Sequence, residues 1–246
     1  MKIKSLFAFT LLWFNSLGQA QEQLQVRVVA TENKLMQYQE NGINKGSTIE
    51  ILNVLLNDNN IQATFDYMPW ARAYRIAETT PNTIILSIVR TPEREEKFHW
   101  IGIVSQLSRV FISLKKYPEN FVNDIEQAKH KIVAVERNAL SHNELIKKGF
   151  IVGKNLYVVS AVEQAFKLLL TGKVDLIYHD PVVIEDYINN EIKGEYEIDY
   201  APINTQNTRV SYIAINKNSD DIIVKKLISS MNNFSKTNLY KKLLNQ

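Results

Sequence analysis

Hydrophobic and polar positions along the chain follow two periods, and the two alternate. Short apolar, β-branched runs predict strands near residues 26–30, 63–68, 83–89, 109–115, 131–135, 174–178 and 210–215. Apolar residues three and four apart predict helices that begin near residues 47, 69, 91, 143, 161, 181, 222 and 239. Strands interleaved with helices are typical of an α/β protein whose sheets contain parallel strands.

Four of these helices carry recognisable start signals. Ser47–Glu50 and Ser160–Glu163 both match the capping box, with serine at the N-cap and glutamate three residues later. Thr91 and Asp180 each precede a proline, which suits the first helical position because its missing N–H has no partner there. We therefore expect these serines, Thr91 and Asp180 to be N-caps.

The first twenty residues differ from the rest. Lys2 and Lys4 are followed by an uncharged segment, 6–17, and by Gly-Gln-Ala at 18–20. This pattern predicts a secretory signal peptide cleaved after Ala20, because the apolar run is short for a membrane span. The chain has no cysteine, so the exported protein would have no disulfide and no lipid anchor at its cleavage site. We expect it to be free in the periplasm.

Charge and motif content exclude several classes of function. The chain has 29 basic and 26 acidic residues, and removal of the leader lysines would leave 27 and 26. Such a balance gives no support to nucleic-acid binding. Eight glycines and no phosphate-loop, dinucleotide or hydrolase motif argue against a cofactor. We expect no metal either, because the histidines lack ligand spacing: His99, His130, His142 and His179.

The stretch after the predicted strand 83–89 suggests an anion site. Thr91 and Pro92 would start a helix at the carboxyl end of that strand, where free N–H groups favour an anion. Arg94 and Arg90 would add guanidinium groups suited to a carboxylate. The alternative is that both arginines pair with acids on an exposed helix face, namely Glu93, Glu95 or Glu96.

Thr91-Pro92-Glu93-Arg94 resembles the signature of the bacterial family 3 extracellular solute-binding proteins, the periplasmic receptors of polar amino-acid importers. The resemblance implies that Arg94 grips the α-carboxylate of a ligand. Gly172–Asp180 resembles the second-lobe segment of that family, whose last acid, here Asp180, binds the ligand's amine. The match extends over most of the mature chain, through segments 46–50, 69–72 and 217–219.

Other site residues follow from position in the same pattern. Trp70, at the exit of the second strand, would form a wall of the pocket, and Tyr38 would cover the ligand. Arg72 would be a second anion contact. The alternatives are that Trp70 belongs to the core and that Tyr38 and Arg72 are exposed. Asp180 could likewise cap its helix without binding a ligand.

Two segments depart from the family pattern. Ser87-Ile88-Val89-Arg90 stands where hydroxyl residues usually precede the arginine, and Arg90 replaces a small or apolar residue. Asn138 and Ala139 begin the turn that replaces the usual Gly-Thr/Ser-Thr. The ligand is therefore left open between a standard amino acid, a modified one, a peptide fragment and another carboxylate.

The predicted architecture is a type II periplasmic-binding fold with two lobes and two hinge crossings. The first lobe would comprise 21–108 and 207–246, and the second 109–206, with crossings near 107–111 and 205–210. A monomer would close on its ligand between Arg94 and Asp180 and deliver it to the permease of an ATP-binding-cassette importer. Two alternatives remain: a dehydratase-like enzyme using Asp180 or Glu136 as its acid, and a receptor that feeds a sensor.

Overall fold

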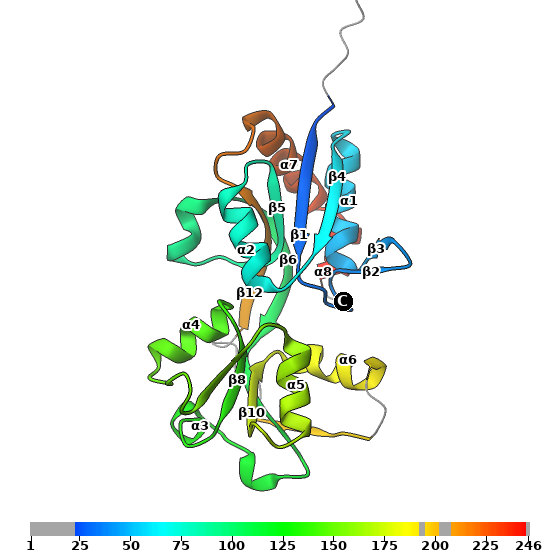
Figure 1. The fold of residues 1–246 in the computed structure, drawn as a ribbon. Coiled ribbons are helices and arrows are strands. Elements are labelled where there is room, and N and C mark those ends of the chain that lie inside the picture. The colour runs from blue at the N-terminus through cyan, green and yellow to red at the C-terminus, as the bar shows by residue number, and fades with distance from the viewer. Residues whose placement is uncertain (1–22, 192–194, 202–207, 245–246) are drawn as a thin grey trace, which may run out of the picture.

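The computed structural model describes residues 23–191, 195–201 and 208–244 as two lobes, stacked one above the other (Figure 1). The predicted signal peptide lies outside the described residues. Each lobe is a five-stranded mixed sheet with helices on both faces, which confirms the predicted two-lobed α/β class. Within the part of the chain that the structure describes, no helix is long and apolar enough to cross a membrane.

The first lobe contains the strands from both ends of the chain. Its strands run in the order β4 (Gln62–Tyr67), β1 (Gln25–Ala30), β5 (Thr83–Val89), β12 (Thr208–Asn216) and β6 (Phe98–Ser108). β1 is parallel to β4 and β5, whereas β12 is antiparallel to β5 and β6. One face is covered by α1 (Ser47–Asp58), α7 (Asp221–Phe234) and α8 (Asn238–Leu244), and the other by α2 (Trp70–Thr79).

Alternation along the strands explains this layering. Val28 packs into the cluster under α1 and α7, and Val29, its neighbour, packs against Ala73 and Ala77 of α2. Both valines are almost completely buried. Because successive side chains of a strand point to opposite faces, a β-branched run such as 26–30 is buried on both sides only when helices cover both.

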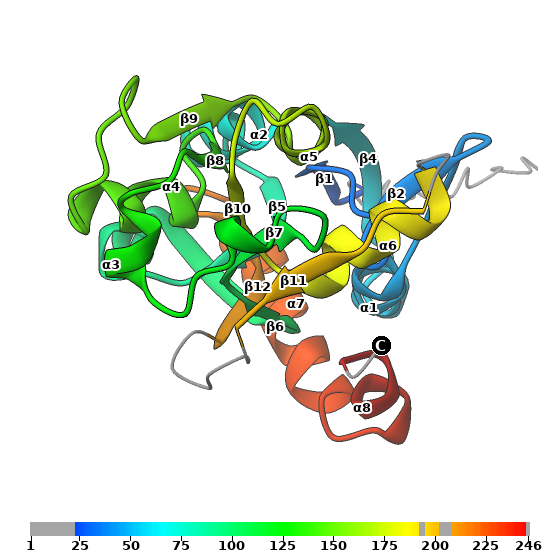
Figure 2. The same cartoon turned by 90° about the horizontal axis from the view of Figure 1, so that it is seen from below.

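The second lobe repeats the arrangement. Its strands run in the order β11 (Ile198–Tyr200), β7 (Val110–Leu114), β10 (Leu176–His179), β8 (Val133–Glu136) and β9 (Leu156–Val159). α5 (Val162–Leu170) and α6 (Pro181–Glu191) pack on one face, and α3 (Ile125–Ala128) and α4 (Leu140–Lys147) on the other, as Figure 2 shows. A short 3-10 helix, η2, covers Pro118–Asn120.

The lobes are joined by the long strands of the first sheet. β6 ends at Ser108, and β7 of the second sheet begins two residues later. β12 returns at Thr208 and pairs with β6 from Ser108 back to Phe98. The second predicted crossing falls partly on residues 202–207, outside the described residues. The exact lobe boundaries stay a prediction.

Several local predictions were wrong. Ser47 and Ser160 do not cap their helices with their side chains. α1 begins at Ser47 itself after Gly46, whose φ is 108° and where an added Cβ would lie 2.4 Å from the Met36 carbonyl oxygen. α5 begins two residues after Ser160, whose N–H donates instead to Gln164 Oε1 at 3.1 Å.

Two elements were not predicted. The first is the eleven-residue strand β6. It directly follows the helix predicted at Thr91, which is a six-residue 3-10 helix, η1 (Pro92–Lys97), with Thr91 at its N-cap position but without a side-chain capping bond. A hairpin, β2 (Tyr38–Glu40) and β3 (Ile43–Lys45), precedes α1. Its Asn41-Gly42 turn, with both residues at positive φ, is a strong hairpin signal.

Candidate ligand-binding site

A cavity of about 500 Å³ lies between the two lobes. Strands of both sheets end in it: the segment after β1 contributes Thr31, β5 contributes Ser87, β8 contributes Glu136 and β10 contributes His179. The carboxyl edge of parallel strands is where ligands of α/β folds usually bind, and this volume suits a small molecule.

Ser87 is held in a strained backbone conformation at the cavity wall. Its φ is 55°, and among the described residues it alone has a positive φ without being asparagine or glycine. The pairing of β5 with β12 shifts register here, so that Leu86 and Ser87 face a single residue, Ile213. This bulge puts both residues into the cavity lining. Ser87 Oγ donates to Gln37 Oε1 at 2.7 Å, which fixes a second lining residue.

Two sets of contacts cross between the lobes on either side of the cavity. On one side, Trp70 Nε1 donates to the carbonyl oxygen of Asn138 at 3.1 Å. On the other, Met36 packs against Val183 of α6. We call these the Trp70 rim and the Met36 rim.

An ion pair outside the cavity also joins the lobes. Lys147 Nζ lies 2.9 Å from Glu93 Oε1, and both side chains are more than 60% exposed. Exposed pairs of this kind contribute little to stability, because water screens the two charges. This ion pair is therefore a minor contact between the lobes.

Glu136 is the most perturbed acid of the site. Its Oε1 atom is buried and, among the described residues, has no hydrogen-bond partner. Burial raises the pKa of Glu136 to about 7, against the effect of the Trp70 N–H, while Glu163 raises it further and Arg109 lowers it. A carboxyl group with this pKa exchanges its proton near neutral pH.

Arg109 and His179 are cavity residues that the sequence did not indicate. Burial lowers the pKa of Arg109, and the nearby Asp180 opposes that shift. Burial, with the charge of Arg109, lowers the pKa of His179 to about 3, so its ring is neutral at physiological pH. Arg109 directly follows the end of β6, so its position at a predicted hinge crossing was the available signal.

The cavity offers charges of both signs. Its acidic lining residues are Glu32, Glu136, Glu163 and Asp186, and its basic ones are Lys34, Arg109 and Lys167. The ring of Trp70 adds an aromatic wall. A lining of this kind suits a small polar ligand that carries both charge and some apolar surface.

Of the predicted site residues, Trp70 and Ser87 line the cavity, and Arg94 does not. The Arg94 side chain is buried, with 6% exposure, and its Nη1 donates to the Val89 carbonyl oxygen at 2.9 Å. Its guanidinium carbon lies 5.6 Å from the Trp70 ring centre and 5.1 Å from that of Tyr74. Arg94 thus supports the cavity wall from behind, and direct contact with a ligand stays a prediction.

Arg90 pairs with an acid on the exposed surface, which is the alternative to a role in an anion site. Its guanidinium forms a two-pronged pair with Glu95 and lies 5.4 Å from the Trp100 ring centre. Both charged side chains are more than 40% exposed. This places Arg90 on the outer surface of the first lobe, away from the cavity lining.

Asp180 uses both of its carboxylate oxygens within the protein. Oδ1 accepts the Val182 N–H at 3.0 Å, so Asp180 caps α6, and Oδ2 accepts the N–H of Ser108 at the end of β6. The side chain is only 5% exposed and is not part of the lining. The capping role is confirmed, and the amine-binding role stays a prediction.

The remaining predicted residues are not part of the cavity lining. Tyr38 lies in the hairpin, with Lys34 Nζ 5.1 Å from its ring centre. Arg72 is exposed on α2. Asn138, with φ of 58°, contributes its carbonyl to the Trp70 rim, and Ala139 precedes α4.

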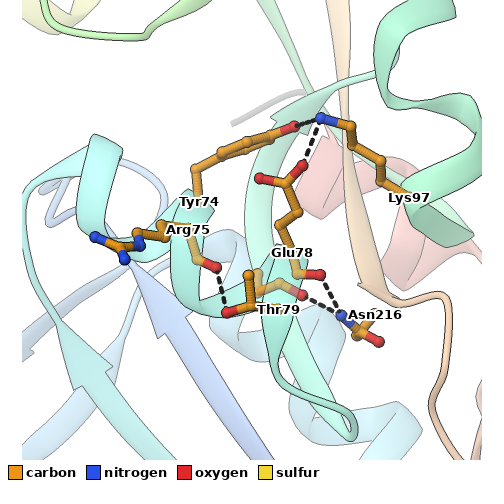
Figure 3. A network of polar contacts seen from close by, with 7 residues as sticks. Tyr74, Arg75, Glu78, Thr79, Lys97 and Asn216 are labelled. Carbon is orange, nitrogen blue, oxygen red and sulfur yellow. Dashed lines mark hydrogen bonds and ion pairs between the residues drawn. The ribbon is translucent and has the colours of Figure 1, made fainter.

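Helix α2, which carries Trp70, is fixed at its other end by the network in Figure 3. Asn216 Nδ2 donates to the carbonyl oxygens of Ala77 and Glu78 at 2.7 and 2.8 Å, the last turn of the helix. Lys97 Nζ bridges the Glu78 carboxylate, at 2.5 Å, and the Tyr74 hydroxyl, at 3.4 Å. These contacts hold the helix whose first residue forms the cavity wall.

Comparison with known proteins supports the fold. No protein-family model matches the chain, and no curated protein matches it. A histidine kinase sensor domain described as similar to periplasmic binding proteins is 14% identical, with a TM-score of 0.76 over 91% of this chain and 96% of that one. The substrate-binding protein of an amino acid ABC transporter is 15% identical, with a TM-score of 0.73 over 89% and 96%.

The ancestral amino acid-binding protein AncCDT-1, described as a precursor of cyclohexadienyl dehydratase, is 18% identical, with a TM-score of 0.71 over 89% of this chain and 93% of that one. At these identities the similarity concerns the fold. The chain therefore has the two-lobed α/β fold of the periplasmic binding proteins, with a charged cavity between its lobes.

Proposed function

We propose that this protein is a receptor that binds a small polar, amino-acid-like ligand between its lobes and closes on it. The observation that carries the proposal is the cavity of about 500 Å³ at the carboxyl ends of both sheets, with its mixed charges. The fold shared with an amino acid ABC transporter's substrate-binding protein supports it.

The mechanism rests on contacts that only the closed form completes. Ser87 and Trp70 belong to the first lobe, and Glu136 and Lys167 to the second. A ligand touching both sets gains its full interaction free energy only when the lobes approach. That difference shifts the population toward closure. Arg94 stabilises Trp70 in this arrangement.

Delivery of the ligand is the next part of the proposal. An exported monomer, released from its leader after Ala20, would present the closed form to the permease of an ATP-binding-cassette importer. The similarity to a kinase sensor domain makes signalling to a membrane receptor the alternative destination.

The proposal is tested with the purified chain in a thermal-shift screen of amino acids, small peptides and organic acids, followed by calorimetry of the hits. Trp70→Ala should weaken a hit at least about tenfold, because it removes a cavity wall and a rim hydrogen bond. Trp100→Ala, which removes a ring outside the lining, is the matched control. No stabilising compound in the screen, or equal loss in both variants, would contradict the proposal.

An enzyme on the same fold is the second candidate. Glu136, with its raised pKa in the cavity, has the property of a general acid, and the dehydratase connection of AncCDT-1 points the same way. Incubation with prephenate-like cyclic carboxylates should give an absorbance change that Glu136→Gln suppresses. Absence of turnover over that panel would exclude this candidate.

A further inference from the structure

A buried oxygen atom in the cavity lacks a hydrogen-bond donor. The inference drawn from this atom rests on the proposed function and concerns the class of ligand. Glu136 Oε1 is buried without a hydrogen-bond partner among the described residues. Leaving a buried carboxylate oxygen without a donor is costly. The atom needs either a proton of its own or a donor from outside the protein.

The charged groups around Glu136 do not supply that donor. Arg109, at the hinge, attracts the carboxylate, and Glu163 of α5 repels it. Lys167 of α5 lines the same cavity, and His179 of β10 is neutral because burial and Arg109 lower its pKa to about 3.

The neighbouring helix α4 does not supply the donor either. Its lysine, Lys147, pairs with Glu93 outside the cavity. His142 is its titratable group beside the Glu136 loop, and its Nδ1 accepts the N–H of Asn138 at 3.3 Å. Burial and the charge of Arg137 lower the pKa of His142. Its ring is therefore neutral at pH 7.

We propose that Glu136 holds a proton in the empty cavity and releases it when an ammonium or guanidinium group of the ligand reaches Oε1. The O–H bond of the carboxyl group breaks, the proton passes to the solvent, and the ligand's cation balances the carboxylate. Trp70, whose ring lines the same space, adds a face on which a cation can rest. The ligand is thus a small molecule that carries a cationic amine or guanidine.

Proton release makes binding depend on pH. With half-ionisation near pH 7, the ionised, binding-competent form rises from about one tenth at pH 6 to about nine tenths at pH 8. The affinity for a cation should therefore increase about tenfold over this range. At pH 7, each binding event should release about half a proton.

The experiment is calorimetry on the full purified chain at pH 6, 7 and 8, in phosphate and in Tris. The two buffers differ in ionisation enthalpy, so the difference in heat counts released protons. The cationic probes are L-arginine, L-lysine and agmatine, and the comparison probes are L-glutamine, L-glutamate and citrate. Glu136→Gln is compared with Glu119→Gln, which changes an exposed glutamate of the same lobe.

A cationic probe that binds with the stated pH dependence and proton count, both lost in Glu136→Gln and kept in Glu119→Gln, supports the inference. Binding without proton release, or binding confined to neutral or anionic probes, overturns it and leaves the receptor function standing. No binding by any probe or by the wider screen overturns both. If circular dichroism shows that Glu136→Gln does not fold, the test is the number of protons that the wild type releases on binding. A count of zero overturns the inference.

Discussion

At the scale of single residues, strain marks the cavity. Ser87 adopts a left-handed backbone inside a strand, and such conformations persist where the surroundings impose them. The bulge and the bond to Gln37 are those surroundings. The strained conformation occurs at a residue that lines the cavity.

Replacement of Ser87 tests this strain directly. Ser87→Val should lower the free energy of unfolding by about 1–3 kcal/mol, because a β-branched residue is disfavoured at positive φ. Ser87→Gly should lower the free energy of unfolding by less, because glycine adopts this φ freely. Urea denaturation of both variants measures the difference, and equal losses would contradict the explanation.

Glu136 should make the stability of the protein fall with rising pH. Its pKa rises from an ordinary 4.5 to about 7 on folding, so the folded state binds the proton more tightly. The stabilising contribution is complete below about pH 4.5 and is lost as pH rises through about 7, a change of about 3 kcal/mol.

The measurement is urea denaturation of the wild type and Glu136→Gln at pH 5, 6, 7 and 8. The difference between the two proteins isolates Glu136 from other titrating groups. A difference that stays constant over this range would show that the carboxyl group is not desolvated as described.

The site was only partly predictable from the sequence. Trp70 and Ser87 were found because each follows or ends a recognisable strand. Arg94 and Asp180 were recognised by motif, yet a motif does not reveal their backbone partners. The partner of Arg94 is the nearby Val89 carbonyl, whereas that of Asp180 is the Ser108 N–H, 72 residues away in the chain. Arg109 and His179 became cavity residues only through the meeting of two lobes.

At the scale of elements, α2 links the cavity to the core. Its first residue reaches the second lobe, and its last turn is held by Asn216 of β12. The helix is therefore held at both ends, by Asn138 at its first residue and by Asn216 at its last turn.

Asn216→Ala should therefore destabilise the protein by about 1–3 kcal/mol, because two buried carbonyl groups lose their donor. Asn218→Ala, two residues on and exposed, is the control and should change stability little. Thermal unfolding of both variants gives the comparison. An unaltered melting temperature for Asn216→Ala would contradict the anchoring role.

Element prediction succeeded where periodicity and burial agree, and failed elsewhere. β1, β5 and α7 have clear patterns and lie close to their predicted ranges. β6 was missed because its residues are interrupted by glycine and polar side chains that suit a strand crossing between lobes. The capping boxes failed because the backbone near Gly46 and Ala161 sets the helix start first.

At the scale of the whole molecule, the two lobes are connected by the paired strands β6 and β12 and by the two rims beside the cavity. The Trp70 rim uses a hydrogen bond and the Met36 rim uses apolar contact. Apolar contact responds to loss of volume, so the Met36 rim can be weakened without touching the charged lining.

Met36→Ser combined with Val183→Ser should favour an open form. The radius of gyration from small-angle X-ray scattering should increase, and the affinity for any ligand found should decrease several-fold. Ile43→Ser, at an exposed hairpin position, is the control. An unchanged radius of gyration would mean that the Met36 rim does not hold the lobes together.

The place of β12 in the first sheet has a consequence for biosynthesis. It lies between β5 and β6, yet it follows the entire second lobe in the chain. On the ribosome, the first sheet therefore lacks the strand between β5 and β6 until the second lobe has been made. The part that emerges first is completed last, and a truncated product cannot yield a finished first sheet.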